Sequence, residues 1–339
     1  MTPILELQSL EIGYPASKDS QHALVPAVSL EVHQGDFIAL SGANGTGKST
    51  LLKTIAGIIP SLDGKILLHS KPLQSYSAAE KALLVSIVLT EYPEDQFLHA
   101  EDVVAMGRYP HIGFWGIMSA SDRHIVAQSM ESCGISHLKG RRLVSLSDGE
   151  RQKTMIAKAL AQDSPLIILD EPSAFLDYPG KIELMQLLKQ LVKTSNKAII
   201  FSSHDLDLVL RSVDQLWLMA KGQPLVTGKP EELVLSGQIN RYFDRDGLSF
   251  DPLLGHFIPE RKKGWMVFVN GHHLHAKWLN NSLLRHGFLL SANPDEELHV
   301  ACETETFTIK YKGKAYICST IDSVTDKLMQ LCDNEISSS

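Results

Sequence analysis

The sequence predicts a layered α/β fold with a mostly parallel core sheet, followed by a small α+β domain. From residue 1 to about 240, short apolar runs alternate with stretches of helical periodicity, a pattern typical of α/β proteins. The clearest buried strands are residues 37–40, 166–169 and 198–201. Polar or small residues follow each strand, and ligands in open parallel sheets collect at these carboxyl ends.

Three further segments complete the expected organisation. Residues 94–161 lack such strands and show helical patterns at 121–133 and 149–162, so we expect a helical insert within a first domain, 1–243. Gly, Pro, Asp and Lys are frequent in residues 244–263, which we interpret as a linker. The α+β domain should occupy residues 264–339, with helices at 276–286 and 322–332 and strands at 265–269, 288–291, 307–311 and 315–318.

Composition restricts the classes of function. The 339 residues carry a net charge of -7, without the basic excess of a phosphate-driven nucleic-acid binder, so we expect no nucleic-acid partner. The cysteines form no C-x-x-C pair, and we expect reduced thiols rather than a zinc site or disulfides. The N-terminus does not resemble a signal peptide, and no run of about 18 apolar residues occurs, so we expect no membrane span.

Residues 42–49 read GANGTGKS and match the phosphate-binding loop G-x-x-x-x-G-K-[ST]. They follow a predicted strand and precede an apolar helix at 50–56, which is the context that this motif requires. The backbone amides form an anion nest, Lys48 reaches the β- and γ-phosphates, and the Ser49 hydroxyl can ligate Mg²⁺. We therefore expect ATP or GTP binding, with contacts from Gly42, Asn44, Gly45, Gly47, Lys48, Ser49 and Thr50.

Titratable side chains follow two other predicted strands. Asp170 and Glu171 come directly after strand 166–169 and precede a proline. Asp170 suits the Mg²⁺ shell, and Glu171 suits polarisation of the attacking water. His204 follows strand 198–201 closely enough to reach the same cluster and contact a γ-phosphate. A lone histidine after a strand is more often structural, but its place beside these motifs favours the functional interpretation.

A further motif, LSDGERQ at residues 146–152, resembles the ABC ATPase signature, usually LSGGQ or LSGGE. Asp148 replaces the usual glycine and is suited to a helix-capping position. The phosphate loop, this signature, Asp170-Glu171, the D-loop-like SAFLD at 173–177 and His204 occur in the order of an ABC ATPase, over residues 1 to about 240. The chain thus resembles ABC transporter ATP-binding subunits, which implies a cassette with antiparallel N-terminal strands and a helical insert.

The resemblance also implies the composition of the nucleotide site. In this family, two copies face each other head to tail, so Ser147 and Gly149 of one copy would close over ATP held by Lys48 of the other. Asp177, at the end of the D-loop-like stretch, is an implied nucleotide contact. Tyr14 matches the aromatic position that stacks on adenine, although a core tyrosine is the simpler interpretation. ATP and Mg²⁺ are the implied cofactors.

The segment 101–111, EDVVAMGRYPH, resembles the one found in importers of ferric siderophores, haem and cobalamin, where it lies beside the transmembrane partner. The implied function is ATP hydrolysis that energises such an importer. The implied partners are permease subunits and, indirectly, a substrate-binding protein. The implied location is peripheral, on the cytoplasmic face of the bacterial inner membrane. The sequence leaves the cargo open, because other subunits select it.

One position departs from the family pattern. A glutamine normally follows the strand that corresponds to residues 84–89, in the loop that couples Mg²⁺ to the membrane subunit. This chain has Thr90 there, whose hydroxyl can still act as an Mg²⁺ ligand, and Gln96 is a second candidate six residues later.

Two alternatives stay open at the level of sequence. A soluble ABC ATPase acting on ribosomes or DNA usually has two cassettes or long coiled coils, which this chain lacks, and a small-molecule kinase would leave the signature unexplained.

In the C-terminal region, His272, His273 and His275 form a histidine cluster, but no neighbouring carboxylate or thiol completes a metal site. We expect a solvated loop there, in a regulatory or dimer-supporting domain.

Overall fold

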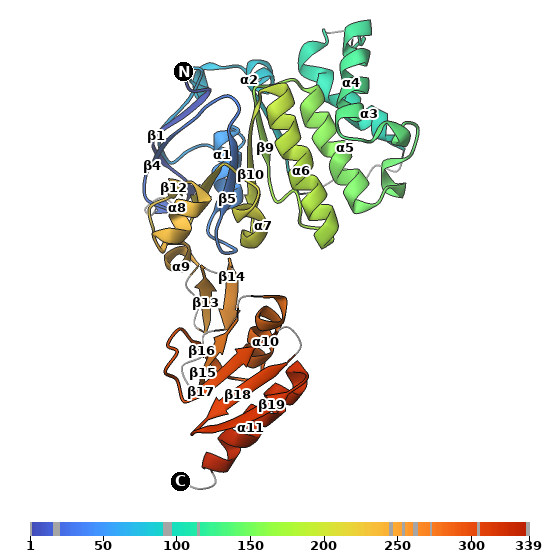
Figure 1. Ribbon diagram of the computed structural model, residues 1–339. Helices are drawn as coiled ribbons and strands as arrows, with labels where there is room; N and C mark the ends of the chain where they lie inside the picture. Colours follow the sequence, from blue (N-terminus) through green and yellow to red (C-terminus); the bar gives the residue numbers. More distant parts are fainter. Residues whose placement is uncertain are drawn as a thin grey trace. The chain divides into compact units, whose positions relative to one another are not determined.

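The computed structural model describes residues 2–15, 21–90, 97–113, 116–243, 247–252, 255–259, 264–271, 273–303 and 306–336 (Figure 1). The chain divides into two compact units, which are described separately. The first unit contains residues 1–244 and 250–257, and the second contains 245–249 and 258–339. In the described residues, no helix combines the length and apolar character needed to cross a bilayer.

The first unit is built on a six-stranded sheet in the order β12-β11-β5-β10-β9-β8. Five strands are parallel and only β12 is antiparallel, which confirms the predicted mostly parallel core. Every residue of the three strands predicted as buried, β5, β9 and β10, is buried. The strands are β5 (Phe37–Ser41), β8 (Val85–Val88), β9 (Leu166–Leu169), β10 (Ala198–Ser203), β11 (Gln215–Leu218) and β12 (Val226–Gly228).

The N-terminal strands form a second, antiparallel sheet in the order β4-β1-β6-β7, and β2 pairs with β3 as a separate hairpin. Gly64 faces the bulge of β1 so closely that a Cβ atom would lie 2.3 Å from the Ser9 carbonyl oxygen. These strands are β1 (Leu5–Glu11), β2 (Gly13–Pro15), β3 (Gln21–Ala23), β4 (Val28–Val32), β6 (Asp63–Leu68) and β7 (Lys71–Pro72).

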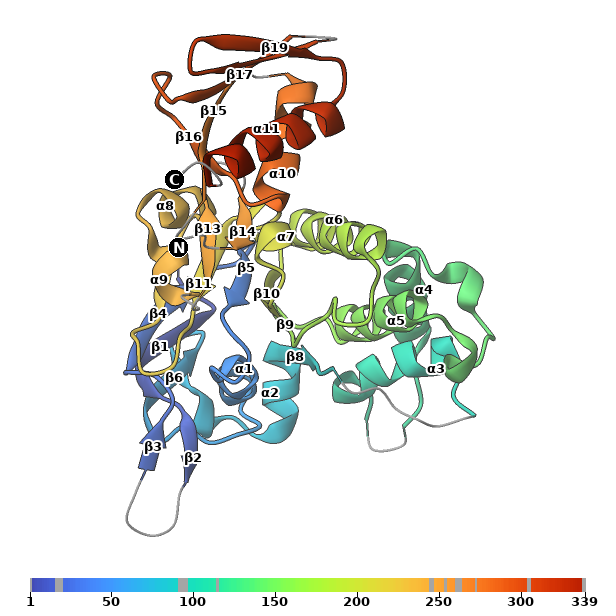
Figure 2. The ribbon, with the colours of Figure 1, turned by 90° about the horizontal axis from the view of Figure 1, so that it is seen from below.

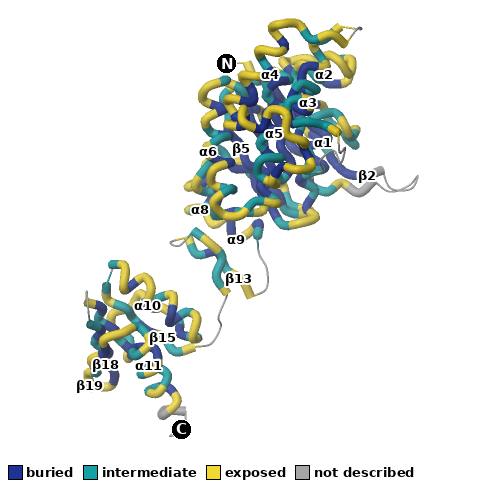
Figure 3. The backbone as a smooth tube through the Cα atoms, turned by 90° about the vertical axis from the view of Figure 1, so that its right-hand side faces the viewer, coloured by how far each residue is buried: buried dark blue, intermediate teal, exposed yellow. Residues whose placement is uncertain are grey.

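Successive side chains of the core strands point to opposite faces of the sheet, and this divides the interior into two apolar layers. Ile199 and Phe201 of β10 pack in a cluster with Leu188, whereas Ile200 packs in a cluster with Leu52. Leu188 belongs to α6 (Tyr178–Ser195), and Leu52 belongs to α1 (Lys48–Ile55), so the two helices cover opposite faces of the core sheet. Figure 2 shows both helices beside the sheet, and Figure 3 shows β5 buried within this unit.

Helices surround the core sheet, and three of them, α3, α4 and α5, lie within the segment 94–161. The observed α4 and α5 confirm the helices predicted at 121–133 and 149–162, each displaced by one residue. A 3-10 helix at Met106–His111 lies between α3 and α4, and two more, Ser136–Leu138 and Leu143–Ser145, lie between α4 and α5. The remaining helices of this unit are α2 (Ala78–Leu84), α3 (Ala100–Ala105), α4 (Ala120–Ser132), α5 (Asp148–Ala161), α7 (Leu206–Leu210), α8 (Pro230–Leu235) and α9 (Gln238–Tyr242).

The segment 106–111 closes the C-terminal end of α5. The buried Arg108 side chain donates to the Ala161 carbonyl at 2.7 Å and pairs with Asp122 at 3.0 Å. Hydrogen bonds from Ser119 and the contact with Arg108 lower the pKa of Asp122 to about 2. His111 Nε2 lies 2.8 Å from the Gln162 carbonyl oxygen. These side chains satisfy carbonyl groups that a helix end leaves without intrahelical partners.

Part of the expected linker, 244–263, has regular structure. Strands β13 (Leu248–Asp251) and β14 (His256–Pro259) form a two-stranded sheet. Phe250 and Phe257 pack edge to face at 5.4 Å, and the Asn240 side chain accepts a hydrogen bond from the Phe250 amide at 2.8 Å. Composition alone did not reveal this hairpin, because its few apolar residues are stabilised by partners outside the segment.

The second unit contains a five-stranded sheet in the order β16-β15-β17-β18-β19. Both of its helices pack on the sheet face that carries Val267, Val300 and Ile309. The predicted elements are confirmed with shifted ends, and β17 is an additional strand between them. The elements are β15 (Met266–Asn270), α10 (Leu274–Arg285), β16 (Leu289–Ser291), β17 (Leu298–Cys302), β18 (Phe307–Tyr311), β19 (Lys314–Cys318) and α11 (Ile321–Ile336).

The cysteines are buried, and the solvated loop expected for the histidine cluster is wrong for two of its members, because His273 is the N-cap of α10 and His275 lies in its first turn. All four cysteines, Cys133, Cys302, Cys318 and Cys332, are buried, and burial raises the pKa of Cys133 to about 12. His273 Nε2 contacts the Cys302 carbonyl oxygen at 2.8 Å, and its ring lies 5.7 Å from that of His275. His272 lies outside the described residues.

Candidate functional site

The phosphate-binding loop connects β5 to α1 and leaves the start of that helix open. Gly45 and Gly47 have φ values of +77° and +105°, a region that side-chain-bearing residues rarely adopt. A Cβ at Gly42 would lie 2.1 Å from the Met219 carbonyl oxygen, so no larger residue fits there. Gly47 is the N-cap of α1 and supplies no side-chain cap. The helix dipole favours an anion at this end of α1.

Lys48 is buried within this loop, with 5% of its surface exposed. Its Nζ atom donates to the carbonyl oxygens of Gly42 at 2.9 Å and Ala43 at 3.2 Å. Burial lowers the pKa of Lys48, and the negative charges of Glu171 and Asp170 oppose that shift. The ammonium group is therefore held against the loop, beside the two carboxylates that follow β9.

Asp170 joins three segments at the carboxyl edge of the core sheet. Its Oδ1 atom accepts hydrogen bonds from the hydroxyls of Ser49, at 2.9 Å, and Ser202, at 2.7 Å. The Ser202 hydroxyl in turn accepts from the Glu171 amide at 2.8 Å. Sequence reasoning missed Ser202. The signal that could have found it is the parallel pairing of β10 with β9, which places both strand ends at one edge.

Glu171 leaves the strand in a left-handed conformation, with φ of +48°. His204 Nδ1 lies 3.8 Å from Glu171 Oε2, and both side chains are partly exposed. The structure therefore brings together Lys48, Ser49, Asp170, Glu171 and His204, which lie far apart in the sequence.

The Thr90 hydroxyl donates to the main-chain carbonyl of Asp170 at 3.1 Å. Thr90 thus lies at the same sheet edge, and its oxygen retains lone pairs that could serve a metal. Gln96 lies outside the described residues. The backbone of Tyr14, in β2, pairs with that of His22, in β3. The Tyr14 side chain is not among the side chains that the structure describes.

The signature-like residues form the start of α5. Ser147 is the N-cap: its hydroxyl accepts from the Glu150 amide at 3.3 Å, and its own amide donates to Glu150 at 2.9 Å. The cap is therefore Ser147 rather than Asp148, which is the first helical residue and pairs with Arg151 at 3.1 Å. Ser147 and Asp148 are exposed, and a Cβ at Gly149 would meet only Leu176 within 4 Å.

The remaining residues predicted to contact the nucleotide differ in their exposure. Asp177 caps α6 by accepting from the Gly180 amide at 3.0 Å. Asn44 is exposed at the loop tip, whereas Thr50 is buried in α1. The described residues contain no group of three or more His, Cys, Asp or Glu side chains able to hold a metal ion alone. The Ser49 and Asp170 oxygens are nevertheless hard donors that converge within hydrogen-bonding distance, which fits a Mg²⁺ ion that completes its shell with phosphate and water.

Comparison with known proteins identifies two sequence families. The family described as "ABC transporter" matches residues 25–174, and the one described as "Iron ABC transporter C-terminal domain" matches residues 264–329. An uncharacterized ABC transporter ATP-binding protein of Methanocaldococcus jannaschii is 34% identical over 254 residues, which cover 75% of this chain and 86% of that protein.

Several relatives have names that state a cargo. The ferric enterobactin transport ATP-binding protein FepC of Escherichia coli K12 is 30% identical over 249 residues, 73% of this chain and 90% of that protein. The iron(3+)-hydroxamate import ATP-binding protein FhuC of Bacillus subtilis is 32% identical over 243 residues, 71% of this chain and 88% of that protein. Among solved structures, a chain of an inward-facing metal-chelate type ABC transporter matches with a TM-score of 0.63 and 26% identity, covering 77% of this chain and 99% of that chain.

Proposed function

This chain belongs to the ATP-binding proteins of ABC transporters, and we propose that it hydrolyses ATP to energise a membrane importer of iron-siderophore, haem or cobalamin. The observation that carries the proposal is the convergence of the buried Lys48 ammonium with the Ser49–Asp170–Ser202 hydrogen bonds at the open start of α1. This arrangement offers positive charge, the N-terminal end of a helix and oxygen donors at one sheet edge. A nucleoside triphosphate and its Mg²⁺ ion require these groups.

Each residue has a proposed role in hydrolysis. The loop amides and Lys48 bind the β- and γ-phosphates, and the oxygens of Ser49, Asp170 and Thr90 lie at the metal position. When bound, Mg²⁺ would neutralise the negative charge that develops on the phosphates. Glu171 orients and polarises the attacking water, and His204, 3.8 Å from Glu171, contacts the γ-phosphate. The Tyr14 ring is assigned to adenine.

We further propose that two copies complete each nucleotide site. Within the described residues, Ser147 makes its side-chain contacts with Glu150, inside the first turn of α5, and none with the phosphate loop. Its exposed position leaves the start of α5 available to a phosphate on another copy. ATP would then stabilise the pair by binding between the copies, and hydrolysis would release it. Asp177 belongs to the same proposed interface.

The partner that couples hydrolysis to transport is proposed to be a permease subunit. The names of FepC and FhuC describe transport of ferric enterobactin and import of iron(3+)-hydroxamate, and the C-terminal region matches an iron-transporter family. On this basis the complex includes a permease and, on the opposite side of the membrane, a substrate-binding protein. The chain acts peripherally, on the cytoplasmic face of a bacterial inner membrane.

Affinity purification of the tagged chain from detergent-solubilised native membranes tests this function. We expect a polytopic membrane protein to co-purify, and we expect the complex to hydrolyse ATP faster when the substrate-binding protein and its loaded cargo are added. Activity stimulated instead by nucleic acid or by a small acceptor molecule, with no membrane protein retained, contradicts the proposal.

Thr90→Ala is expected to weaken Mg²⁺-dependent ATP hydrolysis more than Gln96→Ala does. Thr90 is hydrogen-bonded to Asp170, so its loss removes an oxygen beside the metal position and loosens the carbonyl that it holds. Hydrolysis rates measured over a Mg²⁺ titration should show a higher Mg²⁺ requirement for Thr90→Ala, with Gln96→Ala close to wild type. The reverse ranking contradicts the assignment of Thr90 to the coupling loop.

A further inference from the structure

Ser202 lies near the end of β10, one residue beyond the part of the strand that pairs with β9. Phe201 is in register with the last residue of β9, so the next residues of the two strands, Ser202 and Asp170, lie side by side. Ile200 packs in the cluster that contains Leu52 of α1, and alternation along β10 places Ser202 on the same face of the sheet. Ser202 is completely buried on this face, which is the one that α1 covers.

The Ser202 hydroxyl directs both of its hydrogen bonds to the turn that carries the two carboxylates. It donates to Asp170 Oδ1 at 2.7 Å and accepts from the Glu171 amide at 2.8 Å. A hydroxyl has one proton to donate, so this pair of bonds fixes its orientation. Ser164, another completely buried serine, has a local role instead, because its hydroxyl donates to the Leu166 carbonyl two residues away. Ser202 therefore links one carboxylate to the backbone of the other.

The backbone of Glu171 adopts a conformation that must be held in place. Its φ of +48° lies in the left-handed region, which residues with a side chain rarely adopt unless the surrounding structure holds them there. The Glu171 carboxylate lies 3.8 Å from His204 Nδ1, which is longer than a hydrogen bond. The direction of this side chain therefore depends on the turn from which it leaves the backbone, and the bond from the Glu171 amide to Ser202 acts directly on that turn.

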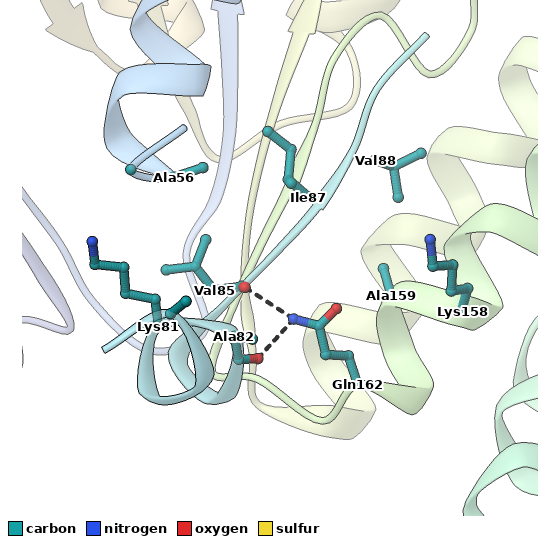
Figure 4. Close-up of a pocket in the computed structure, with 11 residues that line it drawn as sticks. Ala56, Lys81, Ala82, Val85, Ile87, Val88, Lys158, Ala159 and Gln162 are labelled. Carbon is teal, nitrogen blue, oxygen red and sulfur yellow. Dashed lines mark hydrogen bonds between the residues drawn. The ribbon is translucent and has the colours of Figure 1, made fainter. Parts of the chain in front are cut away.

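Strand β8 holds the other side of the same turn. The Asp170 amide donates to the Val88 carbonyl at 2.9 Å, at the end of β8. The start of β8 is tied to α5, because the Gln162 side chain donates to the Val85 carbonyl at 3.0 Å (Figure 4). These bonds fix the backbone at Asp170. The bond to the next amide, that of Glu171, comes from β10 instead.

We propose that Ser202 is a positioning residue for ATP hydrolysis, whose hydroxyl holds the Asp170–Glu171 turn so that the Glu171 carboxylate faces the attacking water. The inference rests on the proposed function, because it takes Glu171 as the group that polarises this water. Ser202 is completely buried, so it acts through Glu171 rather than by contact with the nucleotide. Its second bond, to Asp170, orients the hydroxyl for this task.

Ser202→Ala removes both bonds and is expected to lower kcat for ATP by roughly 10- to 100-fold, since a misplacement of about 1 Å can cost about 10²-fold. The KM for ATP and the equilibrium binding of a fluorescent ATP analogue should stay within about threefold of wild type. The reason is that the bonds of Lys48 to the phosphate loop do not involve Ser202. Steady-state kinetics separate the two effects.

Three further variants complete this comparison. Ser202→Thr keeps the hydroxyl and should retain at least about half of the wild-type kcat. Ser202→Cys has a similar size but only a weak donor and acceptor, so it should show most of the loss even if the alanine variant is unstable. Ser164→Ala is the matched control, because it removes a buried serine hydroxyl just before the opposite end of β9, and it should behave as wild type.

The Glu171→Gln background distinguishes positioning of this carboxylate from a general structural role. If Ser202 acts through Glu171, Ser202→Ala should cost little once the carboxylate is gone, and the kcat of the double variant should lie within about threefold of that of Glu171→Gln alone. Amide hydrogen exchange gives a measurement that is independent of hydrolysis. The Glu171 amide should exchange faster in Ser202→Ala, where it has lost its partner, and at the wild-type rate in Ser164→Ala.

Several results would overturn this inference. They are a kcat of Ser202→Ala within about twofold of wild type, an equal loss in Ser202→Thr, or a loss that appears in KM alone. An equally large effect of Ser202→Ala in the Glu171→Gln background also overturns it. A Glu171→Gln chain that keeps the wild-type turnover would instead contradict the role of Glu171 in the proposed function.

Discussion

Glu171→Gln is expected to lower ATP turnover by about 10²–10⁴-fold, the usual contribution of a general base, while leaving ATP binding intact. Glutamine keeps the size of the side chain but cannot polarise the attacking water. The hydrogen bonds of Lys48 to the loop carbonyls and those of Asp170 to Ser49 and Ser202 do not involve the Glu171 carboxylate, so the phosphate site should survive. Steady-state hydrolysis and equilibrium binding of a fluorescent ATP analogue measure the two quantities separately.

The same variant reports on pairing of the chain. If ATP binds between two copies and hydrolysis releases them, Glu171→Gln should accumulate as a dimer on gel filtration with ATP and Mg²⁺, and elute as a monomer without nucleotide. Glu183→Gln, an exposed change on α6, should behave as wild type. A Glu171→Gln chain that stays monomeric at saturating ATP contradicts the interfacial site, and one that retains turnover contradicts the role of Glu171.

Mixing two inactive variants should restore hydrolysis. Lys48→Ala removes the buried cation of the phosphate loop, and Ser147→Arg blocks the exposed start of α5, so each variant alone should be inactive. If Lys48 of one copy works with Ser147 of the other, a mixed dimer has one site with both defects and one intact site. Half of the dimers in an equal mixture are mixed, so we expect roughly a quarter of the wild-type rate.

A second mixture supplies the control. Lys48→Ala and Asp170→Asn affect the same half of the site, so every site in their mixed dimers carries a defect and no recovery is expected. Hydrolysis rates as a function of mixing ratio distinguish the two cases. Failure of Lys48→Ala and Ser147→Arg to complement, with both chains shown to dimerise, would falsify the two-copy site.

Contiguous motifs explain how much of the site was accessible from sequence. The loop 42–49 acts through its own backbone and the helix that follows, so its chemistry is visible in eight consecutive residues. Asp170, Glu171 and His204 were found because each comes shortly after a strongly apolar strand, and the ends of parallel strands lie at one edge. Ser202 was missed because a serine near a strand end has no distinctive pattern. Its role depends on lying 2.7 Å from Asp170.

Weakly apolar segments explain what was missed in the fold. Strand β17 and the hairpin β13–β14 are stabilised by neighbours elsewhere in the chain, such as Asn240 at Phe250. The cap of α5 was placed one residue late, because both Ser147 and Asp148 are capping residue types and only geometry distinguishes them. Segments whose pairing energy comes from distant partners carry little local signal.

By itself, the sequence determined the α/β class, the order of the motifs along the chain and the family. Apolar periodicity and glycine spacing are local properties, so they can be recognised without the structure. Tertiary structure alone decided which distant side chains meet. It placed Arg108 and Gln162 around the end of α5, and it set Thr90 against the Asp170 carbonyl. Such contacts depend on how helices and strands pack, and packing is a property of the whole chain.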